Sequence, residues 1–398
     1  IRVGCVVWGP PQRPTRENLA MTRPNRRLVL AALLAASLVT FEPLTAKLPL
    51  AAATVVKYQL QYWDIPGRTG PIYVENINDA GQIVGYYKPT PTADARGFLY
   101  DPRLSTTQAF DLETLIGGAG LPPGWSLSVA RDINNHGMIL GQMSSTDPVT
   151  GKSLVWPFLL DMNAETPTVM PLELPEPITK CVAMAINDNG DTLLNYPDVA
   201  SGSFRKLFFN PFVHEVPILL DPELYSVYLS NPVDGSPAMV GGMMGGSYGL
   251  GTTAYWAVPE LGIQTYSSMG DWTGINDMND SGHFCGIYGT RPMRMITLPP
   301  MTFSAGISAR AINNVDDVAI EGGWVYRNET GLTLLKNLLS GSRTDLSTWG
   351  KATRTKCNLL TERQANTNHA RIGGTQEFVA NGVTTIRPFL LTPIVVKR

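Results

Sequence analysis

The feature that most constrains the fold of this chain is a nine-residue segment that recurs along most of its length. In each copy an apolar residue and an asparagine precede a turn and a second apolar stretch. The clearest copies are Ile77 to Gly85 (INDAGQIVG), Ile133 to Gly141 (INNHGMILG) and Met278 to Gly286 (MNDSGHFCG). Weaker copies run from Ile186 to Leu194, from Ile312 to Ile320 and from Ala365 to Gly373, and one more is inferred around Ser230-Asn231.

The spacing of these copies indicates the architecture. The repeat asparagines are Asn78, Asn134, Asn187, Asn231, Asn279, Asn313 and Asn366, so the six intervals between the first and the last average 48 residues. A period of about 40–50 residues with four strands per unit is typical of the blades of a β-propeller. At 398 residues the chain is long for a single core, and an array of repeats explains how it buries its apolar residues.

The residues of the motif predict a hairpin. Asn and Asp tolerate left-handed backbone conformations, and the glycine at the fifth position supplies a positive φ, so the motif turn joins two paired strands. A third strand follows in most repeats: RGFLYD (96–101), WPFLLD (156–161), RKLFFN (205–210), TAYWAV (253–258), GGWVYR (322–327) and RPFLL (387–391). A fourth follows in several, including AFDLETL (109–115) and GLTLLKNLL (331–339). We therefore predict an all-β fold, a propeller of about seven four-stranded antiparallel blades that forms one domain over residues 54–398.

The two ends of this domain predict how the ring closes. The last repeat has little chain left for a fourth strand, whereas residues 54–64 form a strand-like segment with no blade of its own. An open propeller would expose two sheet edges. We therefore expect the N-terminal strand to complete the last blade, with Val56–Trp63 pairing with Arg387–Ile394.

The repeat resembles that of the HAF-type extracellular repeat proteins, which carry an Ile-Asn-x-x-Gly-x-Val-x-Gly segment followed by a Phe-containing strand. The resemblance covers nearly all of residues 54–398. Where that family has His-Ala-Phe, this chain has Arg96-Gly97-Phe98, Trp156-Pro157-Phe158 and Arg387-Pro388-Phe389. The resemblance implies export and a propeller, and it implies no established activity.

The N-terminal region predicts export. Arg23, Arg26 and Arg27 precede an apolar run from Leu28 to Val39, which is the pattern of a secretory signal peptide, and small residues follow it. We assign residues 21–53 to this signal and residues 1–20 to an upstream extension, with the mature chain beginning near Lys47 or Thr54. The alternative is an uncleaved anchor helix. The expected location is the periplasm or the extracellular space, with no stable membrane insertion after cleavage.

Composition excludes several partners. The formal net charge of −2 offers no basic surface for nucleic acid and no polybasic segment for an anionic membrane. Cys181, Cys285 and Cys357 are an odd number beyond the signal, and we interpret them as buried thiols.

The motifs of common enzymes and metal sites do not occur. We find no Gly-x-Ser-x-Gly elbow, no His-Glu-x-x-His and no phosphate-binding Gly-rich loop, and we predict no cofactor and no metal. Asp188, Gly190 and Thr192 are similar to part of the Asp-box of sialidase-like propellers, which is itself a structural turn. The acidic turns lack the regular spacing of calcium loops, and the four histidines occupy different motif positions, so we interpret both groups as turn or surface residues.

Aromatic residues recur just beyond the second strand, at Tyr86, Tyr87, Tyr196 and Tyr288. Exposed on one face they would stack on sugar rings or bind a peptide, so they are our candidate ligand-binding residues, and ordinary packing is the alternative. The loops between second and third strands, residues 88–95, 143–155, 197–204 and 243–252, should share that face.

The leading hypothesis is a secreted binding module for a carbohydrate, a protein or another cell-surface component. The competing hypothesis is a propeller hydrolase or lyase acting on polysaccharide, which would need convergent carboxylates with a perturbed pKa around the channel.

Overall fold

The structure is a computed structural model that describes residues 54–174, 180–197, 204–211, 218–220, 224–231, 240–244, 253–258, 262–265, 273–296, 300–340 and 347–397. These residues belong to one compact unit, Ala53–Arg398. The upstream extension and the signal peptide that we assigned to residues 1–53 lie outside them. Within the described ranges, no helix is both long and apolar enough to cross a membrane.

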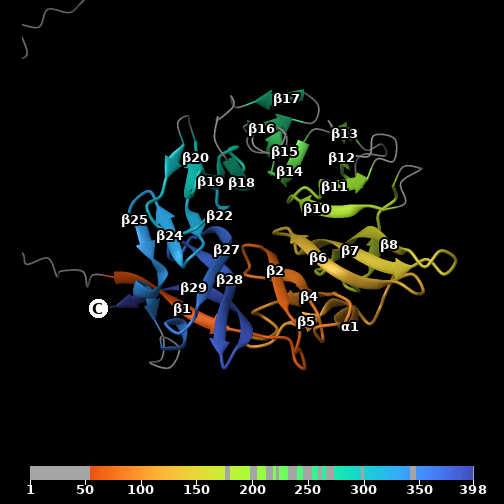
Figure 1. Ribbon diagram of the computed structural model, residues 1–398, viewed down its shortest axis with the longest axis horizontal. Coiled ribbons are helices and arrows are strands. Elements are labelled where there is room, and N and C mark those ends of the chain that lie inside the picture. The colour runs from red at the N-terminus through yellow and green to blue at the C-terminus, as the bar shows by residue number, and fades with distance from the viewer. Residues whose placement is uncertain are drawn as a thin grey trace, which may run out of the picture. The chain divides into compact units, whose positions relative to one another are not determined.

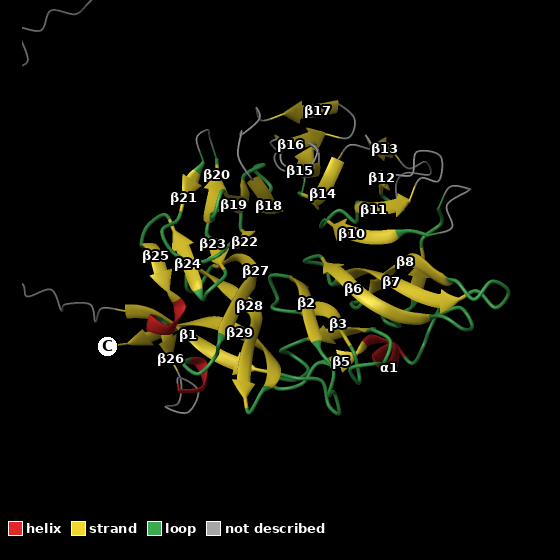
Figure 2. Cartoon of the chain, viewed as in Figure 1, coloured by secondary structure: helices red, strands yellow, loops and turns green. Residues whose placement is uncertain are grey.

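The regular secondary structure of the described chain is almost entirely β-strand, joined by loops and turns (Figure 2). Six four-stranded antiparallel sheets follow one another in sequence, each pairing its strands in chain order. The first three are β2 (Ile72–Ile77), β3 (Ile83–Tyr87), β4 (Arg96–Tyr100), β5 (Phe110–Asp111); β6 (Ser126–Ile133), β7 (Met138–Thr146), β8 (Ser153–Asp161), β9 (Val169–Pro171); and β10 (Val182–Ile186), β11 (Thr192–Pro197), β12 (Phe204–Phe209), β13 (Ile218–Leu220). The next three are β14 (Leu224–Leu229), β15 (Val240–Met244), β16 (Thr253–Val258), β17 (Gly262–Thr265); β18 (Thr273–Met278), β19 (Phe284–Tyr288), β20 (Arg291–Met295), β21 (Met301–Thr302); and β22 (Ala309–Ile312), β23 (Val318–Ile320), β24 (Trp324–Arg327), β25 (Gly331–Leu334).

A seventh sheet joins the two ends of the described chain. Its order is β26 (Leu339–Ser340), β1 (Thr54–Tyr62), β29 (Val383–Lys397), β28 (His369–Ala380) and β27 (Arg354–Gln364). β1 runs antiparallel to β29, from Thr54 opposite Lys397 to Tyr62 opposite Phe389, and the two strands lie side by side in Figure 1. We had expected Val56–Trp63 to pair with Arg387–Ile394; the observed ladder instead pairs Thr54–Tyr62 with Phe389–Lys397, so it begins two residues earlier on β1 and ends one residue earlier. The sheet has five strands and not four, because β26 adds to β1 in parallel.

Each sheet packs on the next along the chain. The innermost strand of one sheet contacts the preceding sheet, as β6 contacts β2, β3 and β4, and β2 in turn contacts β27 of the seventh sheet. Between the sheets lie clusters of buried apolar residues, such as the cluster of Val84, Leu99, Ile139 and Phe158. The core is therefore a series of apolar layers between neighbouring sheets. The arrangement is a propeller-like all-β fold.

The motif turns have the predicted backbone. Gly81, Gly137, Gly190 and Gly282 have φ values between 75° and 84°, at the fifth position of their copies. In the sixth sheet this position is Asp316, with a φ of 64°. A left-handed aspartate is less favourable than glycine, but its side chain can make hydrogen bonds that glycine cannot.

The second glycine of the motif is required by a close approach of the inner strand. A Cβ at Gly85 would lie 2.1 Å from the carbonyl oxygen of Tyr73, and one at Gly286 would lie 1.8 Å from that of Gly274. The ring of Phe98, directly opposite Gly85 on the third strand, is fully buried over this position. The motif glycine Gly85 and the downstream Phe98 therefore pack directly against each other.

Two copies of the repeat were placed wrongly in the sequence. In the fourth sheet Ser230, and not Asn231, is the counterpart of the repeat asparagine, because it accepts the hydrogen bond from Asn187. In the seventh sheet the counterpart is Thr361, and not Asn366, for the equivalent bond from Asn313. The corresponding glycine is Gly374, opposite Phe389, and not Gly373. The hairpin formed by β27 and β28 extends further beyond Thr361 and Gly374 than the other motif hairpins do, and this displaced the alignment.

The outer strands also differ from the prediction. Only Phe110 and Asp111 of the segment 109–115 form a strand, and α1 (Leu112–Ile116) follows. Asp111 caps this helix through the backbone N–H of Thr114, and Gly117 ends it with a φ of 63°. In the segment 331–339 the strand ends at Leu334, and a 3₁₀ turn, η1 (Leu335–Asn337), follows.

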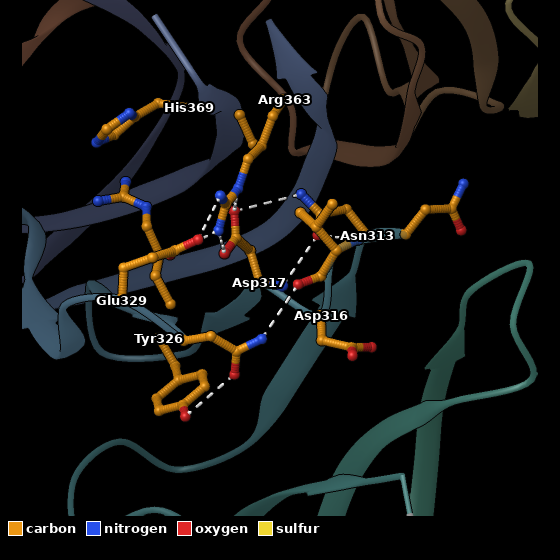
Figure 3. Close-up of polar contacts among 12 residues, drawn as sticks. Asn313, Asp316, Asp317, Tyr326, Glu329, Arg363 and His369 are labelled. Atoms are coloured by element: carbon orange, nitrogen blue, oxygen red, sulfur yellow. Dashed lines mark hydrogen bonds and ion pairs between the residues drawn. The ribbon is translucent and has the colours of Figure 1, made fainter. Parts of the chain in front are cut away.

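An ionic network that runs from the buried Asp317 to the exposed Glu329 connects the sixth and seventh sheets (Figure 3). The guanidinium of Arg363 binds both oxygens of Asp317, at 2.6 and 2.8 Å, and both oxygens of Glu329, at 2.7 and 2.9 Å. Asp317 is fully buried, so its charge depends on this partner. Arg363 therefore has a structural role, which is to compensate the buried charge of Asp317.

The three cysteines are buried and free, as predicted. Burial raises the pKa of Cys181 and of Cys357 to about 12. They pack as small apolar residues.

Candidate functional site

A closed cycle of hydrogen bonds runs through the motif turns of all seven sheets. Its members are Asp79, Asn135, Asp188, Asn231, Asp280, Asn314 and Glu362, which we call the turn ring. The backbone N–H of each member donates to a side-chain oxygen of the next, at 2.6–2.8 Å, and Glu362 donates to Asp79. The cycle returns to its starting residue after seven bonds.

The repeat asparagines form a second, partly parallel set of bonds. The Nδ2 of Asn78 donates to the carbonyl oxygen of Asn134 at 3.1 Å, and Asn134 donates in the same way to Asn187 at 3.0 Å. Each asparagine also accepts backbone N–H bonds of its own turn through Oδ1, as Asn134 does from Met138. The motif asparagine therefore closes its own turn and binds the next sheet, and this explains why the repeat keeps it.

A β-bulge on each innermost strand places one further residue at the same level of every sheet. Among the residues skipped by the pairing register is one in each sheet, which we call its bulge residue: Glu75, Arg131, Met184, Ser226, Asn276, Arg310 and Asn358. The register also skips Ser128 in β6 and Thr361 and Glu362 in β27. In six sheets the bulge residue stands three positions before the motif asparagine or its counterpart, and in the fourth sheet it stands four before Ser230. Bulges re-aim side chains and are over-represented beside active sites.

Two connected cavities lie along the innermost strands. The first, about 330 Å³, is lined by the turn ring. The second, about 380 Å³, is lined by Glu75, Arg131, Met184, Asn276, Arg310 and Asn358, and we call it the bulge cavity. Both cavities include Asn76, Asp132 and Asp277 in their walls, so they are successive parts of one space. The bulge cavity is within the volume range of small-molecule sites, roughly 300–1,000 Å³.

The charged bulge residues are held in place by ion pairs. Glu75 binds Arg131 at 2.6 Å, and burial raises the pKa of Glu75. Arg310 binds Oε2 of Glu321 through Nε at 3.1 Å and Nη2 at 2.7 Å, and Glu321 is fully buried. Fixed guanidinium groups in a cavity are suited to orienting a polar ligand.

Two buried carboxylates stand between the two cavities. Asp132 accepts from the backbone N–H groups of Ile133 and Ile186, and Asp277 accepts from those of Met278 and Ile312. Burial raises the pKa of Asp132 to about 6 and the pKa of Asp277 to about 7. In the turn ring, burial likewise raises the pKa of Asp79, and it raises the pKa of Glu362 to about 7. The channel thus has convergent carboxylates with perturbed pKa values, the feature that we required of an enzyme. All four also accept backbone hydrogen bonds that join neighbouring sheets.

The structure does not gather the four candidate tyrosines into one exposed group. Tyr86 is half-buried and stacks on Tyr73, with 4.7 Å between ring centroids. Tyr87 is buried, at 5% exposure, and its hydroxyl donates to Asp111 at 2.9 Å, because neighbouring strand residues point to opposite sides. Tyr196 packs against the apolar cluster between the second and third sheets, and Tyr288 is half-buried.

The loops between second and third strands are described only in part. Residues 88–95 connect β3 and β4 as expected. The loop placed at 143–155 is shorter, because β7 continues to Thr146 and β8 begins at Ser153. Residues 198–203 and 245–252, most of the other two loops, lie outside the described residues.

The part of the chain that the structure describes contains no group of three or more metal-ligating side chains arranged to hold an ion. His283 binds Asp316 at 2.8 Å, and His136 is exposed. His214 lies outside the described residues.

The bulge cavity was missed in the sequence analysis, although a signal for it exists. Position −3 from the motif asparagine holds Glu75, Arg131, Asn276 and Arg310, polar residues on strands that otherwise point apolar side chains into the core.

Comparisons with known proteins show limited similarity. No family model matches the sequence, and no curated protein matches it. Among solved structures, the chain is similar to Pyrococcus horikoshii acylaminoacyl peptidase, with a TM-score of 0.39 and 10% identity over 78% of this chain and 51% of that one. It therefore spans about half the length of that peptidase. It is also similar to a thermostable family-43 glycoside hydrolase, with a TM-score of 0.29 and 10% identity over 83% of this chain and 93% of that one.

Proposed function

We propose that this protein is a seven-bladed β-propeller, closed by β1, that acts as an exported binding module for a carbohydrate held in the bulge cavity. The observation that carries the proposal is the convergence of five polar bulge residues, from five different sheets, on one cavity of about 380 Å³. Carbohydrates present hydroxyl groups in all directions, and hydrogen-bonding side chains arranged around a cavity match them.

The architecture proposed here is supported by two independent features. The turn ring returns to its starting residue through the bond from Glu362 to Asp79. β1 supplies the strand next to β29 that the C-terminal part of the chain lacks. A ring closed in this way has no exposed edge between its first and last blades.

A binding screen with defined saccharides and polysaccharides tests the function. We expect binding to weaken about tenfold or more for Asn276→Ala or Asn358→Ala, since each removes a side chain that lines the cavity. Tyr288→Ala is the matched control, because Tyr288 is outside the cavity wall. If Tyr288→Ala abolishes binding and the two asparagine variants retain it, the binding site would instead lie on the face that was expected to carry the tyrosines and the loops.

The second candidate is a polysaccharide hydrolase or lyase, and the raised pKa values of Asp132 and Asp277 favour it. Against it, each oxygen of Asp277 already accepts a backbone hydrogen bond, which reduces its capacity to transfer a proton. Reducing-end assays on pectic, cellulosic and chitinous substrates decide between the candidates. Turnover that is abolished by Asp277→Asn or Glu75→Gln would establish the enzyme, and binding without turnover would support the module.

Export and membership of the HAF-type repeat proteins are part of the same proposal. They rest on the basic and apolar N-terminal segment and on the repeat itself. Intact-mass measurement of the protein recovered outside the cytoplasm should give a chain that begins near Lys47 or Thr54. Exported protein that retains Met21 would contradict the assignment of a cleaved signal.

A further inference from the structure

Arg310 lines the bulge cavity and has one edge of its guanidinium without a partner among the described residues. Its Nε and Nη2 both bind the same oxygen of Glu321, whereas its Nη1 has no hydrogen-bond partner among the described residues. The edge formed by Nη1 and the second hydrogen of Nη2 is therefore available. Such an edge binds a carboxylate through two parallel N–H bonds.

Arg131 adds a second source of unused donors. Only its Nη1 is bonded, to Glu75, so within the described chain its Nε and Nη2 have no partner. Both arginine side chains retain about a third of their exposure, 37% for Arg310 and 35% for Arg131, although both line the cavity. They can reach a ligand there without breaking their ion pairs.

Two amides line the same cavity, and one of them supplies an acceptor. The Nδ2 of Asn276 donates to Ser308 and to Ala309, so its Oδ1 points away from these two bonds. Asn358 donates to the carbonyl oxygen of Val74 at 3.1 Å, and its Oδ1 is buried out of reach of solvent and has no donor in the described structure. Asn276 is therefore the amide that can accept a hydrogen bond from a ligand hydroxyl, and Asn358 shapes the wall.

The unused guanidinium donors, and not an excess of positive charge, favour an anion here. The wall of the bulge cavity holds two guanidinium groups, of Arg131 and Arg310, and three carboxylates, of Glu75, Asp132 and Asp277. Glu75 is paired with Arg131, and Arg310 is paired with Glu321, which lies outside the wall. Hydrogen bonds from backbone N–H groups partly offset the charges of Asp132 and Asp277.

We propose that the bulge cavity selects an acidic sugar, such as a uronic acid, with the sugar carboxylate on the free edge of Arg310 and a sugar hydroxyl on the amide oxygen of Asn276. This inference rests on the proposed function and specifies the ligand class of the same site. Arg131 assists by donating to the same carboxylate or to a neighbouring hydroxyl. Glu321 is a positioning residue that fixes the direction of the Arg310 edge.

Calorimetric titration of the full chain with glucuronate and with glucose tests the selection, because these sugars differ only in the carboxylate. We expect glucuronate to bind at least about tenfold more tightly than glucose, and this preference to fall as NaCl is raised. Arg310→Met should reduce the preference to about twofold or less and leave glucose binding almost unchanged. Arg310→Lys keeps the charge but not the two-bond edge, so it should restore only part of the preference.

Arg103→Met is the matched control, because Arg103 also pairs with a carboxylate, that of the buried Asp101, but lies outside the cavity. It should keep the full preference. Equal affinity for the two sugars in the unmodified protein, or a preference that survives Arg310→Met, would overturn the inference and leave the proposed function intact. Absence of binding to both sugars and to the polysaccharide panel would contradict the proposed function itself.

Discussion

The backbone N–H of Glu362 donates to Oδ1 of Asp79 at 2.8 Å, although the two residues are 283 positions apart in the sequence. This bond joins the seventh sheet to the first and is one of seven equivalent bonds in the turn ring. Each of these bonds joins two sheets at their innermost turn.

We predict that Asp79→Ala lowers the free energy of unfolding by about 1 kcal/mol, because it leaves the N–H of Glu362 without its acceptor. Asp79→Asn retains an acceptor oxygen and removes the repulsion from Asp188 and Glu362, so its stability should equal or exceed that of the unmodified protein. Urea titrations followed by tryptophan fluorescence measure both. Equal destabilisation by the two variants would show that the charge of Asp79, and not its acceptor oxygen, matters.

Deleting residues 54–64 should lower the stability of the whole domain and not merely fray its end. The deletion exposes the edge of β29 and removes Tyr58, which is fully buried and donates to the carbonyl oxygen of Ala370 at 3.1 Å. We expect a single cooperative thermal transition at a clearly lower temperature. An unchanged transition temperature would contradict closure by β1.

Tyr58→Phe isolates one contact of that strand. The hydroxyl accepts from Arg327, a buried arginine whose Nε has no partner in the described structure, so removing the acceptor should cost about 2 kcal/mol. Tyr73→Phe is the control, because Tyr73 is 43% exposed and should change stability by less than about 0.5 kcal/mol. Chemical denaturation of the two variants gives the comparison.

Gly286→Ala should destabilise the fold by about 3 kcal/mol or more, since the new Cβ would lie 1.8 Å from the carbonyl oxygen of Gly274 on the neighbouring strand. Gly274→Ala is a control in the same pair of strands, because a Cβ there meets nothing within 4 Å. We expect the control to fold normally in a thermal melt. A similar loss in both variants would mean that glycine is required here for backbone freedom and not for space.

The buried aspartates predict how stability depends on pH. The folded protein holds the pKa of Asp277 at about 7, well above its value of about 3.8 in the unfolded chain, so folding favours the protonated form. The contribution of Asp277 is therefore fully present below about pH 4 and is lost as the pH rises through 7. Asp132 acts in the same direction, with its folded pKa at about 6.

Unfolding free energies measured at pH 5 and pH 8 test this dependence. The unmodified protein should lose at least about 1 kcal/mol more than Asp277→Asn between these two values, because the variant has no proton to release at this site. The slope is the informative quantity, since the variant also changes the absolute stability. An identical slope in both proteins would show that Asp277 does not titrate in this range.

Much of the fold was predictable because the signals are local. The apolar residue, asparagine and glycine of INDAGQIVG specify a hairpin within nine residues, through the positive φ of Gly81 and the side-chain bonds of Asn78. Tight turns depend on the conformational freedom of a few adjacent residues, so the sequence of the turn is sufficient. The repeat period then indicated how many such hairpins follow one another.

The candidate site could not be predicted in the same way, because tertiary contacts decide it. Ser230 and Thr361 serve as repeat asparagines only through bonds from Asn187 and Asn313 in other sheets. Arg310, at a bulge, lines a cavity to which six other sheets also contribute residues, and no short segment encodes that cavity. The sequence by itself determined the hairpins of the clear copies, because turn chemistry acts between neighbouring residues. Only the tertiary structure decided where the two weakest copies lie and which side chains meet at the centre, because the bonds that join the sheets there connect residues as far as 284 positions apart.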